Sequence, residues 1–306
     1  MIECAISPTI RQMDLALQGD ILFCLGNYCK MYPEYYSFFK KHGGDRFTIV
    51  DNGAYEFGKP LEGEEYLNIF KQVSGSELVA PDVEFDFDQT KELTRKFLKF
   101  LDSKDVDIEI QLVLQGKDYG DLINNSAEFI SENPPDPRIS SYGVPLYNKK
   151  WQERAAAVKV LGQLSKRPIH LLGLHDPIEL AFYNRKDNVR SADGGFAVKF
   201  AGYDIRWSMD EELPSDKKNK IDKLDIVESN RDAFEHNLKV LRSFSRRCDP
   251  YGIIFPCPMN LNMSKKIKSK TTKLKRKVKK EHKTKTKKKS GDMEELIETW
   301  NEDLCE

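Results

Sequence analysis

Short apolar runs alternate with amphipathic stretches along the first two hundred residues of the chain. The runs are brief and nearly uninterrupted, which is typical of strands buried on both faces of a parallel sheet. Eight segments fit this description: 2–6, 21–25, 47–50, 78–80, 108–114, 139–146, 169–172 and 189–192. Helix-like stretches lie between most of them, at 32–42, 62–74, 89–101, 119–131, 149–164 and 177–183.

The repeated strand and helix pattern predicts the fold. Eight parallel strands, each followed by a helix, close into a TIM (β/α)8 barrel, whereas five or six would leave an open doubly wound sheet. We therefore predict an α/β barrel over residues 1–258. The alternation lapses after Phe200, where 211–223 is charged and rich in turn residues. Apolar residues return at helical spacing in 232–245, which we predict to be the closing helix of the barrel.

Charge is distributed unevenly, although the formal net charge is zero. Residues 264–289 carry 14 Lys and one Arg against one Glu, while residues 1–263 sum to about −7. Segment 259–290 has little to bury, so we predict a disordered, flexible, basic tail. Its expected partner is nucleic acid, because each neutralised phosphate releases a counterion. The candidate nucleic-acid-binding residues are Lys275, Arg276, Lys277, Lys279 and Lys280.

An extension that only solubilises or localises the protein is the alternative interpretation of this tail. The last residues, 291–306, differ from it in character. Met293, Leu296, Ile297 and Trp300 recur at helical spacing among glutamates, which predicts a short acidic amphipathic helix.

Cysteine usage and hydropathy indicate the compartment. The six cysteines include no C-x-x-C pair, so we interpret them as reduced thiols. The N-terminus lacks the pattern of a signal peptide, and no apolar run approaches the roughly 18 residues of a membrane span. The sequence predicts a cytoplasmic protein without a membrane partner, in the host cytoplasm if a phage encodes it.

Polar and small residues gather where the predicted strands end. Asp51 follows the run 47–50 and Asp193 follows 189–192, and small residues come after each. In a barrel the C-terminal strand ends face one pocket, where enzymes of this fold keep their chemistry. Carboxylates and amides that meet there are suited to a hydrogen-bonding heterocycle. The residues at these positions are Asp51, Asn52, Asp82, Gln115, Gly116, Gly143, His175 and Asp193.

Each of these motifs also has a structural interpretation. An aspartate followed by Gly or Asn is an ordinary turn, and Asp82 or Asp86 can cap the following segment. His175 stands next to Asp176, and we interpret it as a neighbour of the next helix rather than a catalytic base. The argument for a site is that independent turns present polar groups on the same rim.

The order of the motifs resembles the tRNA-guanine transglycosylase superfamily, and most closely its compact phage-type DNA transglycosylases that insert 7-deazaguanine bases. The resemblance covers about residues 1–205. The family's aspartate-serine-glycine-glycine-phenylalanine-glutamine motif is Asp-Asn-Gly-Ala-Tyr-Glu here, at 51–56. The other motifs that carry the resemblance lie at 80–83, 112–116, 142–144, 170–177 and 191–193.

The chain departs from the tRNA enzymes in two places. Those enzymes hold zinc with three closely spaced cysteines and a histidine, whereas Cys248 and Cys257 stand alone here, so we predict no metal site. The segment after the nucleophile contains arginine in the tRNA enzymes and is replaced here by 194–199, which argues against tRNA recognition.

The resemblance implies a role for each residue. Asp193 is the expected nucleophile, because a carboxylate can hold the sugar covalently while one base leaves and another enters. Asp51 is the expected proton shuttle between the leaving and incoming bases. The expected base-binding residues are Asn52, Asp82, Gln115, Gly116, Gly143, Val144 and Tyr55, with Gly143 and Val144 contributing backbone groups and Tyr55 stacking on the base.

The sequence therefore predicts a DNA guanine transglycosylase, a base-exchanging pentosyltransferase that acts through a covalent aspartyl-sugar intermediate. The expected partners are DNA and a 7-deazaguanine base of the preQ0 or preQ1 type, with no cofactor and a possible homodimer. Two alternatives stay open. One is a related enzyme that acts on tRNA, other RNA or a nucleoside, and the other is a noncatalytic nucleic-acid-binding paralogue.

Overall fold

The computed structural model describes residues 1–132, 136–183, 187–208, 226 and 230–246. Contacts divide the chain into two compact units, Met1–Pro250 and Tyr251–Glu306. The barrel belongs to the first unit. The predicted basic tail (259–290), the predicted acidic helix (291–306) and the turn-rich stretch 211–223 lie outside the described residues.

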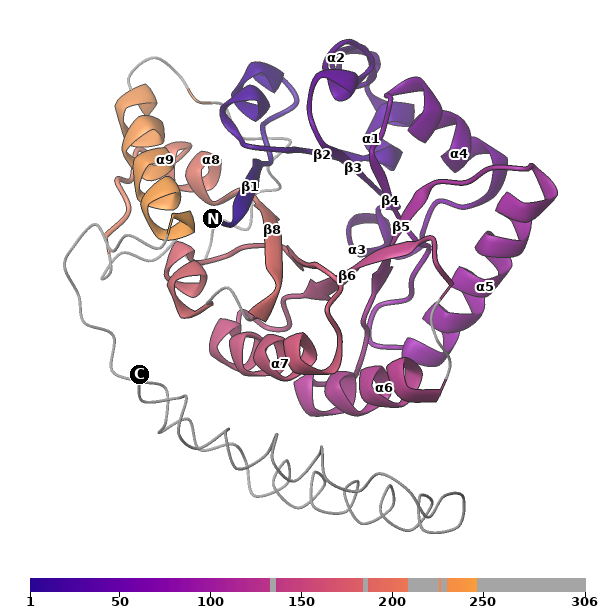
Figure 1. The fold of residues 1–306 in the computed structure, drawn as a ribbon. Helices are drawn as coiled ribbons and strands as arrows, with labels where there is room; N and C mark the ends of the chain where they lie inside the picture. The colour runs from indigo at the N-terminus through magenta and orange to yellow at the C-terminus, as the bar shows by residue number, and fades with distance from the viewer. Residues whose placement is uncertain (133–135, 184–186, 209–225, 227–229, 247–306) are drawn as a thin grey trace. The chain divides into compact units, whose positions relative to one another are not determined.

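Eight parallel strands form the barrel, in the order β1-β8-β7-β6-β5-β4-β3-β2 (Figure 1). The two ends of this order, β1 and β2, meet at a single bridge between Ala5 and Ile21, so the ring is nearly closed. The predicted TIM barrel is confirmed. The strands are β1 (Glu3–Ile6), β2 (Leu22–Leu25), β3 (Thr48–Asp51), β4 (Glu77–Val79), β5 (Glu109–Val113), β6 (Ile139–Pro145), β7 (Ile169–Leu172) and β8 (Val189–Gly194).

Alternate residues of the strands form two apolar layers, because successive strand side chains point to opposite faces. One cluster contains only residues from strands and strand starts, such as Phe23, Ile49 and Val113, and fills the barrel interior. The other joins the intervening strand residues, such as Val50, to helix residues such as Leu67. Burial on both faces explains why the strands are continuously apolar in sequence.

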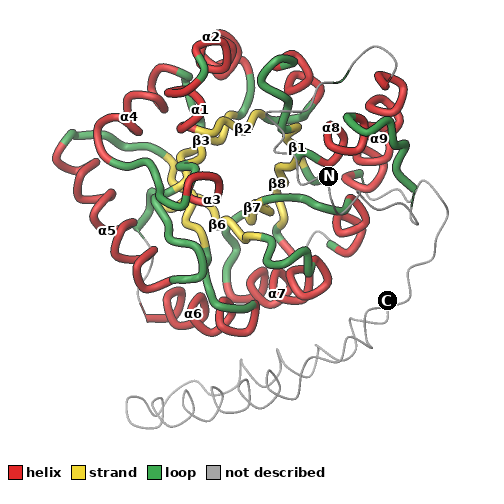
Figure 2. The backbone as a smooth tube through the Cα atoms, turned by 180° about the vertical axis from the view of Figure 1, so that it is seen from behind, coloured by secondary structure: helices red, strands yellow, loops and turns green. Residues whose placement is uncertain are grey.

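Helices surround the strand ring, and one short helix lies over its middle (Figures 1 and 2). They are α1 (Gly26–Met31), α2 (Pro33–His42), α3 (Ala54–Phe57), α4 (Gly63–Gln72), α5 (Phe87–Ser103), α6 (Tyr119–Glu132), α7 (Trp151–Leu164), α8 (Phe196–Ala201) and α9 (Arg231–Ser245), with 3-10 turns η1 (Met13–Gln18), η2 (Gly43–Asp45) and η3 (Pro177–Phe182). The segment that we predicted as a helix at 177–183 is a 3-10 turn, begun by Asp176, whose Oδ1 accepts from Ile178 N at 3.0 Å.

Helix α9 is the predicted closing helix. The backbone N–H of Ile2, just before β1, donates to the carbonyl of Ser245 at 3.0 Å. Asn237 on α9 accepts from the N–H of Trp207 at 2.7 Å through its side-chain oxygen. These bonds tie the last described helix to both ends of the barrel sequence.

Two strands extend further than the apolar pattern predicted. Asp51 is the last residue of β3, paired with Leu25, and Asp193 lies within β8, paired with Ala5. The backbone ladder continues through both aspartates because it needs only their N–H and C=O groups. Among the described residues, no helix is long and apolar enough to cross a membrane.

Candidate active site

The candidate site lies where the C-terminal ends of the strands meet. Helix α3 lies over the middle of the strand ring, in front of it in Figure 2. It is bracketed by Gly53 and Gly58, whose φ angles of 72° and 70° are in the left-handed region that favours glycine. Added bulk at Gly53 would also meet the Asn27 side chain at 2.4 Å. The chain therefore turns from β3 directly across the barrel mouth.

Asp82 is the centre of a buried hydrogen-bond network. Its Oδ1 accepts from Asn52 Nδ2 at 2.8 Å, and its Oδ2 accepts from Gln115 Nε2 at 2.7 Å. Burial raises the pKa of Asp82, and the two amide donors oppose that shift. The structure thus brings together three of the predicted base-binding residues, which come from the ends of three neighbouring strands.

The amides on either side of Asp82 are themselves held in place. Asn52 Nδ2 also donates to the carbonyl of Ala80 at 2.9 Å, and its Oδ1 accepts from Ala54 N at 2.8 Å. Both amide hydrogens of Asn52 therefore have acceptors, and the side chain orients Asp82.

Gln115 is anchored from its other end. Its Oε1 accepts from Phe85 N at 3.1 Å and from the hydroxyl of Tyr147 at 3.0 Å. The same hydroxyl accepts from Gly116 N at 3.0 Å. A Cβ at Gly116 would meet the Leu122 backbone at 2.4 Å, so this glycine serves close packing of the loop.

Asp51 faces the interior, two residues after the inward-facing Ile49. Its Oδ2 accepts from Gly53 N at 2.7 Å. Burial raises the pKa of Asp51 well above its ordinary value of 3.8. The negative charges of Glu56, Asp82 and Asp193 raise it further, which indicates that these carboxyl groups share one region. Both effects shift the equilibrium of Asp51 towards its protonated form.

Asp193 is held by a histidine that the sequence pattern did not single out. Its Oδ1 lies 3.2 Å from Nε2 of His170 and accepts from Gly173 N at 2.9 Å. His170 lies on β7 and is wholly buried. Nδ1 of the same ring lies 2.8 Å from Oγ of Ser191. A polar residue in the middle of an apolar strand was the available signal, since such a side chain needs a partner.

Two further charged residues join the site. Burial of the carboxyl group raises the pKa of Glu56 on α3 to about 7, and the charges of Asp193 and Asp82 add to this shift. Burial lowers the pKa of Lys199 on α8, while Asp193 and Glu56 raise it. Neither was predicted as a site residue, although Glu56 ends the motif 51–56 and Lys199 ends the segment 194–199, because each lies on a short helix that has no clear periodicity.

The remaining predicted residues take different positions. Gly143 on β6 faces the interior, where an added Cβ would lie 3.2 Å from Nε2 of Gln111. Val144 is buried, and its carbonyl accepts from Arg154 Nη1 at 3.4 Å. Tyr55 on α3 is 77% exposed, so its ring is available at the mouth. His175 lies in the loop before η3, and burial lowers its pKa to about 4.

The opposite end of the barrel carries a buried ion pair. Glu77, at the start of β4, is wholly buried and accepts from Arg190 Nη2 at 2.5 Å. Oγ of Ser141 donates to the same carboxylate at 2.6 Å. Its hydrogen bonds to Arg190 and the serines lower the pKa of Glu77 against the opposing effect of burial. We interpret this ion pair as a structural feature that fills the N-terminal end of the barrel interior with hydrogen-bonded polar groups.

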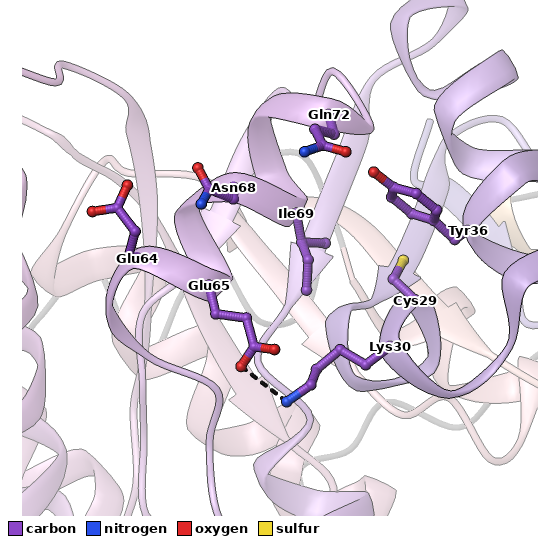
Figure 3. A pocket seen from close by; sticks show the side chains of 8 residues that line it. All are labelled: Cys29, Lys30, Tyr36, Glu64, Glu65, Asn68, Ile69 and Gln72. Carbon is purple, nitrogen blue, oxygen red and sulfur yellow. Dashed lines mark hydrogen bonds and ion pairs between the residues drawn. The ribbon is translucent and has the colours of Figure 1, made fainter.

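A surface groove of about 460 Å³ lies on the outer side of the molecule, between α1, α2 and α4 (Figure 3). Lys30 and Glu65 form an ion pair across it at 2.9 Å. Cys29 lies at its edge, with Sγ 3.4 Å from Sγ of the buried Cys24. The groove is separate from the strand ends, and the carboxylates of the candidate site do not line it.

The predicted nucleic-acid-binding residues of the tail, Lys275, Arg276, Lys277, Lys279 and Lys280, lie outside the described residues, as do Cys248 and Cys257. The predictions about nucleic acid and metal therefore stay predictions. No protein-family model matches the chain, and a search of curated proteins finds no match.

Proposed function

We propose that the protein exchanges guanine in DNA for a 7-deazaguanine base through a covalent aspartyl-sugar intermediate. The observation that carries this proposal is the pair of carboxyl groups Asp51 and Asp193 at one barrel mouth, each held by a different set of hydrogen-bond donors. Burial raises the pKa of Asp51, whereas Asp193 accepts two hydrogen bonds on a single oxygen.

This asymmetry fits a base exchange. A departing guanine must gain a proton, and a buried carboxyl group with a raised pKa can supply it as a general acid. The anomeric carbon must be held while the bases change places, and a carboxylate whose other oxygen is fixed can serve as the nucleophile. Asp51 is assigned the first role and Asp193 the second.

The network around Asp82 supports recognition of a heterocycle. Each carboxylate oxygen can accept more than one hydrogen bond, so Asp82 can bind a base edge while Asn52 and Gln115 hold it. The amide of Gln111, which is wholly buried, has no hydrogen-bond partner in the part of the chain that the structure describes. Placed beside Gly143, it offers a donor and an acceptor deeper in the barrel.

Nucleic acid is proposed as the substrate because of the charges of the chain, and DNA rather than tRNA because segment 194–199 replaces the arginine-containing segment of the tRNA enzymes. Residues 1–263 sum to about −7, while residues 264–289 carry a charge of about +14. A duplex guanine must also leave the base stack to reach an interior site, at a cost of a few kcal/mol. Basic residues that hold the neighbouring phosphates would offset part of this cost.

The experiment is an incorporation assay with the full-length protein. Duplex DNA, single-stranded DNA and tRNA are incubated separately with radiolabelled guanine or labelled preQ0 and preQ1, and label in the polymer is counted. Incorporation into DNA, lost in Asp193→Asn, is the expected result. Incorporation into tRNA alone would show that tRNA, and not DNA, is the substrate. The proposal would be refuted if no polymer took up label or formed a covalent adduct.

A further inference from the structure

A chain of hydrogen bonds runs through the barrel interior and ends at Asp193. Arg190, which is paired with Glu77, donates from Nε to Oγ of Ser191 at 3.4 Å. Oγ of Ser191 lies 2.8 Å from Nδ1 of His170, and Nε2 of that ring lies 3.2 Å from Oδ1 of Asp193. Glu77, Ser191 and His170 are all wholly buried.

The last member of this chain, Asp193, sets its direction. An ionised carboxylate only accepts, so Nε2 of His170 donates to Oδ1 of Asp193. Nδ1 of the neutral ring then accepts from Oγ of Ser191, whose lone pairs can take the hydrogen of Arg190 Nε. A neutral imidazole that accepts at Nδ1 carries its proton on Nε2. The chain therefore holds His170 in the tautomer that donates to Asp193.

Two donors meet on the same carboxylate oxygen. Besides His170, the backbone N–H of Gly173 donates to Oδ1 of Asp193 at 2.9 Å. Within the described residues, Oδ2 accepts no hydrogen bond. The arrangement therefore fixes one oxygen and leaves the other to attack a sugar carbon.

We propose that His170 is a positioning residue that makes Asp193 a good leaving group in the second half of the exchange. This inference rests on the proposed function. In the first half, the bond from Oδ2 to the anomeric carbon forms as the carbon–nitrogen bond to guanine breaks. The electron pair of that bond goes to the guanine, which takes a proton from Asp51.

In the second half, a nitrogen of the incoming base attacks the anomeric carbon and its proton returns to Asp51. The bond between the carbon and Oδ2 breaks, and its electron pair returns to Asp193. The carboxylate regains its negative charge at this point, where charge-assisted donors act most strongly. His170 and Gly173 supply these donors, so they speed the release of the covalent intermediate.

Ser191, His170 and Asp193 match the residue types of a hydrolase triad, but their placement differs. The Ser191 hydroxyl is wholly buried and its hydrogen is directed to His170, so it is not a nucleophile. His170 also stacks on Phe23, with ring centroids 5.5 Å apart and planes 8° apart. A test must therefore separate the donor from the packing of the ring.

Three variants make this separation. His170→Phe keeps a ring against Phe23 and removes the donor, while His170→Gln keeps a donor without the ring. Phe23→Leu is the matched control, which weakens the packing and leaves the donor. Each variant is compared with wild type by circular dichroism and thermal melting before it is assayed.

The readout is the covalent protein–DNA adduct, captured by denaturation during exchange. We expect His170→Phe to accumulate the adduct and to exchange bases about tenfold more slowly, as the loss of a charge-assisted hydrogen bond implies. His170→Gln should recover part of the rate, and Phe23→Leu should lower the melting temperature without raising the adduct fraction. Wild-type rate and adduct level in a folded His170→Phe would overturn the inference while the proposed function stands.

A second measurement does not depend on activity. Nitrogen-15 NMR distinguishes the two imidazole tautomers, and the His170 signal is assigned by its absence in His170→Phe. We expect proton attachment at Nε2 and a changed Nε2 shift in Asp193→Asn. Attachment at Nδ1 would overturn the inference. Failure of the proposed function is recognised separately, as a wild-type protein that forms neither adduct nor exchanged product.

Discussion

Asn52 donates a hydrogen bond from Nδ2 to Oδ1 of Asp82 at 2.8 Å, linking the end of β3 to the segment after β4. Asn52→Asp would place a second carboxyl group against Asp82 and remove a donor. Like charges at this distance cannot both ionise easily, so we expect a loss of about 1–3 kcal/mol of stability at pH 7. Urea unfolding at pH 7 and pH 5 measures it, and the loss should shrink as the pH falls, because protonation of either carboxyl group relieves the repulsion. An equal loss at both pH values would contradict this account.

The raised pKa of Asp51 predicts a pH dependence of stability. The folded state binds this proton more tightly than the unfolded chain, so the stabilisation is complete below the ordinary value of 3.8 and is lost as the pH rises through the folded value. Asp51→Asn should therefore flatten the stability profile above pH 4 and be more stable than wild type near neutrality.

The control for this profile has the opposite sign. A hydrogen bond from Gln89 N lowers the pKa of Asp86, the N-cap of α5. Its contribution is present above 3.8 and is lost as the pH falls. Asp86→Asn should change only the low-pH part of the profile of stability against pH. If the profile of Asp51→Asn ran parallel to that of wild type, Asp51 would not titrate as described.

Substitution of each of the two proposed catalytic carboxyl groups should produce a different kind of defect. Asp193→Asn should abolish both adduct and exchange. Asp51→Asn should slow exchange by about 10²- to 10⁴-fold, the usual range for a general acid or base, while DNA binding is retained. Single-turnover assays with labelled base measure both, with Glu92→Gln on the exposed face of α5 as the control. Comparable exchange in Asp193→Asn would refute its role as nucleophile.

Arg154 and Glu179 form a wholly buried bidentate ion pair, with Nε–Oε1 and Nη2–Oε2 distances of 2.7 and 2.6 Å. Arg154 also donates to the carbonyl of Leu172 at 2.7 Å, next to Gly173. Arg154→Met should cost about 3–5 kcal/mol, because it leaves Glu179 charged and unpaired. The double variant Arg154→Met/Glu179→Leu should lose less stability than Arg154→Met alone. Thermal and urea unfolding compare the variants, and a double variant that is as unstable as the sum of the singles would exclude coupling.

Deletion of residues 264–306 tests the role of the basic segment. If it binds phosphates, the deletion should weaken DNA affinity and reduce the slope of log affinity against log salt by about 0.9 for each lost phosphate contact on duplex DNA. Fluorescence anisotropy over a salt series measures the slope. The control is deletion of 291–306 alone, which removes only acidic charge, and an unchanged slope in the longer deletion would assign DNA binding elsewhere.

The strand positions could be predicted from the sequence because burial on both faces makes each strand continuously apolar. Asp51 and Asp193 were placed at the right strands for the same reason, since each interrupts an apolar run. The predicted ends of the strands were less accurate than their positions. The β8 ladder continues through Asp193 to Gly194 because strand pairing uses backbone groups, which the side-chain pattern does not report.

The contacts between motifs could not be predicted in the same way. The bond between His170 and Asp193 joins residues 23 positions apart, and only the register of β7 and β8 brings them together. The position of α3 is another example. Four residues are too few for a helical period, and its path across the mouth follows from the two left-handed glycines at its ends.

Helix α3 has a consequence for the energetic cost of substitutions at the barrel mouth. Of its four residues only Ala54 is buried, whereas Tyr55 and Phe57 are exposed. Substitutions at exposed positions rarely alter stability by more than about 0.5 kcal/mol. Substitutions at Tyr55 or Phe57 are therefore expected to change what the barrel mouth contacts and to leave the stability of the barrel almost unchanged.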